Sequence, residues 1–250
     1  MKENRFDIDI GAIPATVYLP KVFDRKLSCM IVCHGWGGSR RLWRLPEKIK
    51  NKVLGRGMAV ISVDLYALCD REDMTYALWA DEISRVVDYA RALDYIEKSK
   101  VGLFAFSSGT TAAFGCALEK TAPDFIISVA TCVSANIGMS EGGPFVQMQD
   151  EETRIFMGEK VKKAFFTDCI ENAPIKKLAL VNTPTLILQG GSDNKYRLSD
   201  AAEAQKLLQK SFLKIYPDGT HSLDNCATEA ANDTLNWLFE HGFCSEPQNR

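Results

Sequence analysis

The stretch VGLFAFSSG, residues 101–109, is an apolar strand that runs directly into a turn of small residues around a serine. A serine at a sharp strand-to-helix turn needs small residues two positions away on each side, because bulky side chains would collide with the folded-back chain. Ala105 and Gly109 meet this requirement for Ser107. A turn centred on Ser108 would have bulkier flanking residues. Ser107 is therefore the candidate nucleophile.

The surrounding sequence must decide whether this turn is functional, because similar patterns also occur in ordinary loops and helix caps. Apolar strand-like runs alternate with amphipathic helical stretches, which predicts an α/β fold with a mostly parallel, doubly wound sheet. Strands are expected at 27–33, 58–64, 100–106, 125–132, 185–189 and 213–216. Helices are expected at 43–54, 76–96, 109–119, 200–208 and 225–239. Residues 6–10 and 16–19 flank a Gly/Pro turn, which predicts an antiparallel hairpin at the sheet edge.

Length and composition indicate one globular domain over residues 1–250, since 46% of the residues are hydrophobic and 25% are charged. The formal net charge is −2, and Lys and Arg are scattered rather than gathered into a basic stripe, which argues against a nucleic-acid partner. The N-terminal residues are charged, and no apolar run is long enough to span a membrane. We therefore expect a cytoplasmic protein with no membrane partner.

Eight cysteines are present, and several of them lie inside apolar patterns that are typical of buried thiols, namely Cys29, Cys33, Cys116 and Cys132. No CxxC motif or Cys/His cluster has the spacing of zinc ligands. A reducing compartment is the simpler interpretation, and the sequence implies neither a metal nor an organic cofactor.

Residues 136–180 interrupt the alternation of strands and helices and are too many for a plain crossover. The segment mixes glycines with large apolar residues, among them Met139, Phe145 and Met148. Long insertions on α/β scaffolds are often functional lids, and this one is predicted to be a short lid-like insertion. The alternative is that its aromatic residues simply pack the segment onto the core.

A serine hydroxyl needs a base to take its proton, usually a histidine oriented by a carboxylate. The chain has three histidines, of which His34 lies in CHGWGG and His241 at the end of the last helix. His221 follows the strand LKIYP through the turn DGTH, and is therefore the candidate base. Asp193 follows the strand of TPTLILQGGSD, at the same carboxyl edge of the sheet, and is the candidate carboxylate.

The order Ser107, Asp193, His221, each after a separate strand, resembles the α/β-hydrolase superfamily over nearly the whole chain. The length, the HG-type loop and the GxxD and TH endings are similar to compact bacterial esterases of the feruloyl or cinnamoyl type. Two departures stand out: position 105 is Ala where the family most often has Gly, and VDLYALCD at 63–70 lacks the glycine-rich turn commonly found there.

The resemblance implies an oxyanion hole, because the family has an HGxxG segment after an early strand and VCHGWGG at 32–38 matches it. By that match the backbone N–H groups of Trp36 and Ser108 would bind the developing oxyanion. A phosphate-binding loop is the alternative, but neither GxGxxG nor GxxxxGK[ST] can be read there. His34 is expected to shape the loop, and the ring of Trp36 either faces the acyl pocket or packs. Candidate substrate contacts are His34, Gly35, Met139, Phe145 and Met148.

Together these residues predict a serine hydrolase that cleaves carboxylic esters through an acyl-enzyme, with aromatic or short acyl groups. A thioesterase or peptidase on the same fold remains an alternative, as does a non-catalytic small-molecule receptor. The expected partner is a small-molecule ester, and a homodimer is left open.

Overall fold

The structure is a computed structural model that describes residues 3–133, 152–156, 158–171, 173–195 and 198–246. Within these residues, eight strands form one sheet in the order β1-β2-β4-β3-β5-β6-β9-β10. The strands are β1 (Asn4–Ile10), β2 (Ile13–Leu19), β3 (Leu27–Cys33), β4 (Met58–Val63), β5 (Ile96–Phe106), β6 (Ile126–Val129), β9 (Thr185–Gly190) and β10 (Ser211–Tyr216). All neighbouring strands from β4 to β10 are parallel, and β2 is antiparallel to both β1 and β4.

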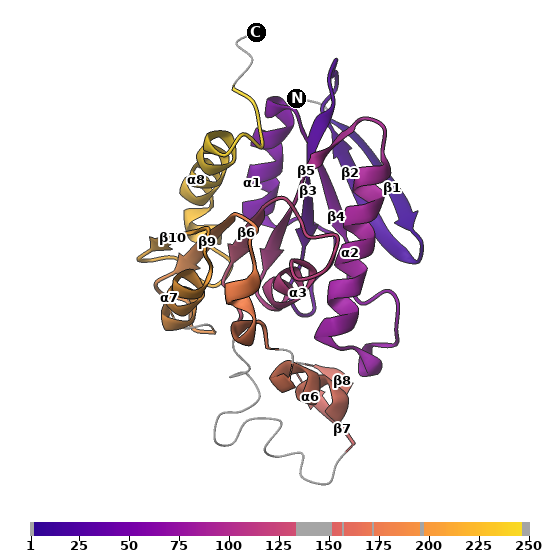
Figure 1. The fold of residues 1–250 in the computed structure, drawn as a ribbon, viewed down its shortest axis with the longest axis vertical. Helices are drawn as coiled ribbons and strands as arrows, with labels where there is room; N and C mark the ends of the chain where they lie inside the picture. Colours follow the sequence, from indigo (N-terminus) through magenta and orange to yellow (C-terminus); the bar gives the residue numbers. More distant parts are fainter. Residues whose placement is uncertain (1–2, 134–151, 157, 172, 196–197, 247–250) are drawn as a thin grey trace.

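Helices cover both faces of this sheet (Figure 1). Their bounds are α1 (Arg44–Val53), α2 (Tyr76–Ala92), α3 (Ser108–Cys116), α7 (Leu198–Leu207) and α8 (Ala227–Glu240). The short 3-10 turns are η1 (Leu54–Arg56), η2 (Arg71–Asp73), η3 (Pro174–Lys176), η4 (Leu178–Leu180) and η5 (Asp224–Cys226). Helices α1 and α8 pack on one face, and α2, α3 and α7 on the other. No helix in the described part of the chain is long and apolar enough to cross a bilayer.

Strand β3 shows why the centre of the sheet is parallel and buried. All seven of its residues are buried, and they alternate between the two faces. Ile31 belongs to the cluster under α2 and α3, whereas Met30 and Val32 belong to the cluster under α1 and α8. Such continuous apolar runs are typical of strands covered on both faces. The predicted doubly wound, mostly parallel α/β sheet with an edge hairpin is confirmed.

Several predicted boundaries differ from the structure, and two of these differences have a clear physical cause. The helix expected at 76–96 ends at Ala92, because Leu93 takes an extended backbone conformation with φ −73° and ψ 127°. Ile96, which continues the three-and-four apolar spacing of the helix, instead pairs with Leu27 of β3 as the first residue of β5. The strand expected at 125–132 ends at Val129, because Ala130 takes a positive φ of 51° that an extended strand cannot hold.

The described part of the insertion contains a two-stranded sheet and one helix: β7 (Thr153–Phe156), β8 (Glu159–Lys162) and α6 (Lys163–Glu171). Figure 1 shows this unit beyond one end of the main sheet, next to the start of α2. The Asp168 carboxylate of α6 accepts a 2.6 Å hydrogen bond from the Tyr76 N–H at the start of α2. Because the first N–H groups of a helix have no acceptor inside it, this contact attaches the insertion to the core.

Candidate active site

Ser107 lies at the turn between β5 and α3, as the sequence predicts. Its backbone has φ 54° and ψ −128°, a conformation that non-glycine residues rarely adopt and that is found where the surrounding structure enforces it. Its N–H donates to the Val129 carbonyl at 2.9 Å, and its carbonyl accepts from the Thr110 N–H at 2.9 Å. Both neighbouring elements therefore fix the strained turn, which presents the hydroxyl at the carboxyl end of the sheet.

Glycines around this turn allow the loop after β3 to approach it closely. A Cβ on Gly109 would lie 2.4 Å from the His34 carbonyl oxygen, and a Cβ on Gly35 would lie 2.9 Å from the Ser107 Cβ. The requirement for a small residue at position 109 thus comes from the neighbouring loop. Ala105 is fully buried in the core with its methyl group.

Ser107, His221 and Asp193 form a continuous hydrogen-bonded chain. The distance from His221 Nε2 to Ser107 Oγ is 3.1 Å, and His221 Nδ1 lies 3.0 and 2.9 Å from the two carboxylate oxygens of Asp193. The Asp193 side chain is 0% exposed, whereas that of His221 is 15% exposed. An imidazole held this way has its proton on Nδ1, facing the carboxylate, and its basic nitrogen toward the hydroxyl.

Two interlocked loops bring Asp193 and His221 together. The Gly191 N–H donates to the Tyr216 carbonyl at 2.8 Å, and the Ser192 N–H donates to the Gly219 carbonyl at 3.0 Å. A Cβ on Gly190 would lie only 2.3 Å from the Gly219 carbonyl oxygen. The loops after β9 and β10 can therefore come this close only because Gly190 lacks a side chain.

Gln189, the last polar residue of β9, also contacts the site, and the sequence analysis missed it. Its Nε2 donates to Asp193 Oδ2 at 3.2 Å, while the Lys195 N–H donates to Oδ1 at 2.8 Å. These donors stabilise the buried carboxylate in its ionised form. The available signal was an amide at the end of the otherwise apolar strand TLILQ.

His34 is the first residue of the loop 34–38, and its side chain is buried, with only 2% of the residue exposed. Its Nε2 accepts a 3.0 Å hydrogen bond from the Leu65 N–H, so the ring proton must be on Nδ1. Nδ1 then donates to the Gly35 carbonyl at 2.7 Å. The expected role of His34 in shaping this loop fits these contacts, because both ring nitrogens are engaged by backbone groups.

Ser108 directly follows Ser107, and Trp36 follows Gly35 in the loop after β3. Ser108 is the first residue of α3, so its N–H is among those without an acceptor inside the helix. Gly35 in turn approaches Ser107 so closely that a Cβ on it would lie 2.9 Å from the Ser107 Cβ. The ring of Trp36 packs between core and insertion, with centroids 5.1 Å from Phe156 and 5.2 Å from Phe165.

Three candidate substrate contacts, Met139, Phe145 and Met148, lie outside the described residues. The buried thiols offer no competing nucleophile at neutral pH. Burial raises the pKa of Cys29 to about 12 and that of Cys116 to about 11, so both remain protonated. Among the residues described, no group of three or more His, Cys, Asp or Glu side chains is placed to hold a metal ion.

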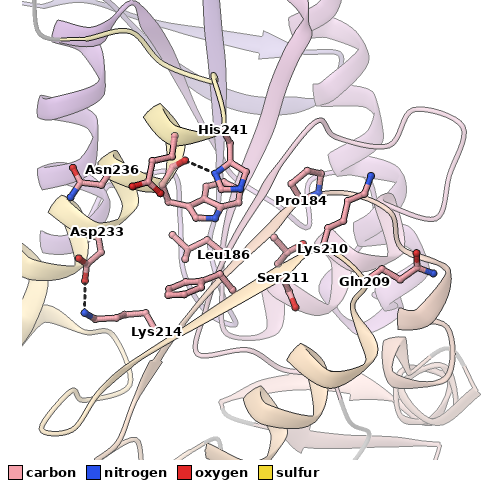
Figure 2. A pocket seen from close by; sticks show the side chains of 13 residues that line it. Pro184, Leu186, Gln209, Lys210, Ser211, Lys214, Asp233, Asn236 and His241 are labelled. Atoms are coloured by element: carbon pink, nitrogen blue, oxygen red, sulfur yellow. Dashed lines mark hydrogen bonds and ion pairs between the residues drawn. The ribbon is translucent and has the colours of Figure 1, made fainter.

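Away from Ser107, a cavity of about 620 Å³ lies between α8 and the strands β9 and β10 (Figure 2). Lys214 lies 3.4 Å from Asp233 across it, and His241 Nδ1 lies 2.8 Å from the Trp237 carbonyl oxygen. The side chains of the Ser107 site do not line this cavity. The described residues that line it have no arrangement like that at Ser107.

The fold is shared with several hydrolases of known structure. Est1E from Butyrivibrio proteoclasticus superposes with a TM-score of 0.76 and 21% identity, covering 94% of this chain and 98% of that one, and has also been solved with ferulic acid bound. The thermophilic esterase Est2 from the Planctomycetes species Thermogutta terrifontis, with butyrate bound, has a TM-score of 0.71 and 15% identity over 97% and 96% of the two chains. Dienelactone hydrolase from Anabaena variabilis has a TM-score of 0.64 and 19% identity over 96% and 97%.

The sequence itself matches no protein-family model, and no curated protein matches it at a significant level. The structural similarities nevertheless extend over nearly the whole of both chains in each comparison. They establish the expected α/β-hydrolase fold for this protein.

Proposed function

We propose that the protein is a serine hydrolase that cleaves carboxylic esters through an acyl-enzyme intermediate. The observation that carries this proposal is the 3.1 Å approach of His221 Nε2 to Ser107 Oγ, with the buried Asp193 carboxylate on the opposite ring nitrogen. A hydroxyl, a base within hydrogen-bond reach and a group that orients the base are the parts that nucleophilic catalysis needs.

The reaction would begin when Ser107 Oγ attacks the ester carbonyl carbon and its proton moves to His221 Nε2. The resulting imidazolium is stabilised by Asp193, which keeps its own negative charge. The tetrahedral intermediate collapses as the C–O bond to the alcohol breaks, and His221 returns the proton to the departing oxygen. The acyl group remains on Ser107.

Water then completes the cycle by the same steps. His221 takes a proton from the water as its oxygen attacks the acyl-enzyme, and gives that proton to Ser107 Oγ when the acid leaves. The N–H groups of Trp36 and Ser108 are the proposed donors to the negatively charged oxygen of both tetrahedral intermediates. Loss of one such donor typically costs on the order of 3 kcal/mol of transition-state stabilisation.

For the acyl group we propose a short or an aromatic acid. The proteins of the same fold include one solved with ferulic acid and one with butyrate. The aromatic cluster of Trp36, Phe156 and Phe165 is suited to contacts with an aromatic acyl group, and the insertion is proposed to act as the lid that selects it.

The test is the Ser107→Ala variant, assayed on a panel of short acyl, long acyl and hydroxycinnamoyl esters. We expect its kcat to fall by about 10⁴-fold or more, because the nucleophile is absent. A fluorophosphonate should label the wild type at Ser107 and leave the variant unlabelled. Ser99→Ala, an exposed serine on the same strand, is the matched control and should keep full activity.

Other outcomes separate the remaining alternatives. Labelling of Ser107 with turnover of thioesters or peptides, and none of oxygen esters, would replace the esterase by a thioesterase or peptidase. Tight ligand binding with neither labelling nor turnover would indicate a small-molecule receptor. Undiminished ester turnover in Ser107→Ala would contradict the assignment of the nucleophile.

A further inference from the structure

We propose that Glu82, a buried carboxylate on α2, is a positioning residue that holds the proposed oxyanion loop through the neighbouring loop 64–68. This inference rests on the proposed function, because it concerns how the same site is built. Glu82 touches none of the three residues of the Ser107 chain in the contacts above. It acts through two layers of backbone hydrogen bonds.

Glu82 binds the backbone of the loop that follows β4. Its side chain is only 1% exposed, and its two oxygens accept from the Tyr66 N–H at 2.7 Å and from the Leu68 N–H at 2.8 Å. Two N–H groups of this loop therefore converge on one side chain, one at each oxygen, and an ionised carboxylate accepts strongly at both.

The conformation of this loop is one that it would not adopt without support. Tyr66 has a positive φ of 74°, which is unfavourable for a bulky residue without a local hydrogen bond to enforce it. Its ring packs on Trp79, one turn before Glu82 on the same helix, with centroids 4.1 Å apart. Glu82 and Trp79 thus hold the backbone and the side chain of Tyr66 from the same face of α2.

The loop then fixes the residues that approach Ser107. The N–H of Leu65, next to Tyr66, is the donor that keeps His34 Nε2 unprotonated, so that Nδ1–H can donate to the Gly35 carbonyl. The Tyr66 hydroxyl lies 3.5 Å from the same carbonyl oxygen. Because a carbonyl and the next N–H belong to one planar peptide unit, the Gly35 carbonyl sets the direction of the Trp36 N–H.

The other end of the oxyanion loop is attached to the same neighbour. The Asp64 carboxylate accepts from both the backbone N–H and the guanidinium of Arg40, and the Ser62 hydroxyl donates to the Arg40 carbonyl at 2.8 Å. Loop 34–40 is therefore fastened at both ends to the chain that leaves β4. Glu82 controls where the chain after β4 lies, and that chain in turn controls where the Trp36 N–H lies.

The primary test is Glu82→Gln, compared with Asp81→Asn on the same helix as the matched control. A glutamine has one accepting oxygen and turns an NH₂ group toward the remaining N–H donors, so part of the loop is released. Asp81 is exposed and forms an ion pair with Arg85 in the next turn, so its variant should behave as wild type. We expect Glu82→Gln to lower kcat by about 10- to 100-fold. This is less than the loss of about 10²- to 10³-fold for a whole oxyanion donor, because the N–H is displaced rather than removed.

Two readouts separate positioning from a merely structural role. KM should change by less than about threefold, because the ground-state ester carries no oxyanion. The affinity for a trifluoromethyl ketone, which forms a negatively charged tetrahedral adduct on the serine, should fall by the same factor as kcat/KM. A variant that is folded, with unchanged kcat and unchanged ketone affinity, would overturn the proposal. So would a change confined to KM.

A spectroscopic measurement tests the link without any activity. The chain has three histidines, so their ring nitrogens can be resolved by ¹⁵N NMR. In the wild type the His34 ring should keep a single Nδ1–H tautomer, because Nε2 accepts from the Leu65 N–H. In Glu82→Gln its signals should move or broaden, and identical His34 signals in the two proteins would overturn the link.

Failure of the inference and failure of the proposed function give different results. A wild type without ester turnover or Ser107 labelling rejects the proposed function, and the NMR comparison still tests whether Glu82 controls His34. A fully active wild type with an equally active Glu82→Gln rejects only the inference. If Glu82→Gln does not fold, Glu82→Asp takes its place, because it keeps the charge and withdraws the oxygens from the loop. Wild-type kcat and ketone affinity in a folded Glu82→Asp would then overturn the proposal.

Discussion

The two sides of Ser107 are built in different ways. On the acid–base side, Asp193 and His221 come from loops after β9 and β10 that touch backbone to backbone through glycines. On the side of the proposed oxyanion hole, the loops after β3 and β4 are joined by side chains, since the His34 imidazole and the Glu82 carboxylate each bind backbone groups of the loop beside them.

This difference reflects what each side must present to a substrate. The acid–base side presents side chains, so it needs only two loops in fixed contact. The oxyanion side presents backbone N–H groups, which have no side chain of their own with which to find a position. Other residues must hold that backbone, and here they are buried polar groups with all their hydrogen-bonding capacity directed at it.

The largest effect is expected when the carboxylate beside His221 loses its charge. Asp193→Asn keeps the size of the side chain but removes the charge that orients His221 and stabilises its protonated form. We expect kcat for a short-chain aryl ester to fall by about 10⁴-fold, with little change in KM. Asp218→Asn, an exposed carboxylate on the loop that carries His221, is the control and should keep wild-type kinetics. A loss of less than tenfold in Asp193→Asn would mean that His221 is not oriented by this carboxylate.

A smaller effect is expected from separating the two acid–base loops. An alanine at position 190 would place its Cβ 2.3 Å from the Gly219 carbonyl oxygen, so the loops must move apart and stretch the Asp193 to His221 contact. We expect kcat to fall by about 100-fold and the unfolding free energy by about 1 to 3 kcal/mol.

The matched glycine is Gly11, in the turn between β1 and β2. It has φ +62° and no atom within 4 Å of an added Cβ, so Gly11→Ala should lose about 1 kcal/mol of stability through backbone strain alone. Its kcat should equal that of the wild type. Thermal unfolding and steady-state kinetics on both variants decide the matter, and equal kcat values for the two would show that loop contact does not control the site.

The same contrast explains which parts of the site could be predicted from sequence. Ser107, Asp193 and His221 each follow an apolar strand at a turn, so local patterns place all three at one edge of a parallel sheet. That the structure brings them within hydrogen-bond distance follows from this placement. Gly109 could be identified as small, although the carbonyl that requires it belongs to His34 on another strand.

Glu82 and Gln189 could not be assigned in this way. The partners of Glu82 lie in a distant loop, and Gln189 stands at the end of an apolar strand pattern that gives its amide no distinct signal. Glu82 lies among Trp79, Ile83 and Val86 on the buried face of α2, and an acid on such a face is the only local signal. The misplaced end of α2 has a similar cause. Ile96 satisfies the helical spacing equally well, and only its pairing with Leu27 assigns it to a strand.

The smallest expected effect is the pH dependence of stability that Glu82 causes. Desolvation raises the pKa of Glu82 above its ordinary value, and the N–H donors of Leu68, Tyr66 and Ala67 oppose this only in part; the neighbouring Asp81 raises it further. The pKa of Glu82 is therefore higher in the folded protein than in the unfolded chain. At pH values between these two pKa values, the folded protein holds a proton on Glu82 that the unfolded chain has released. The contribution of Glu82 to stability is therefore fully present below about pH 4 and is lost as the pH rises through the raised pKa.

Glu82→Gln cannot titrate at this position and keeps every other ionisable group, so the difference in unfolding free energy between it and the wild type isolates this carboxylate. Urea titrations between about pH 4 and 8 should show the wild type losing stability relative to the variant as the pH rises, and then a constant difference. A difference that grows with pH in favour of the wild type would mean that the N–H donors outweigh desolvation. With the expected sign, ionisation of Glu82 costs stability at a position beside the residues that approach Ser107, and a residue selected only for stability of the core would not be an acid there.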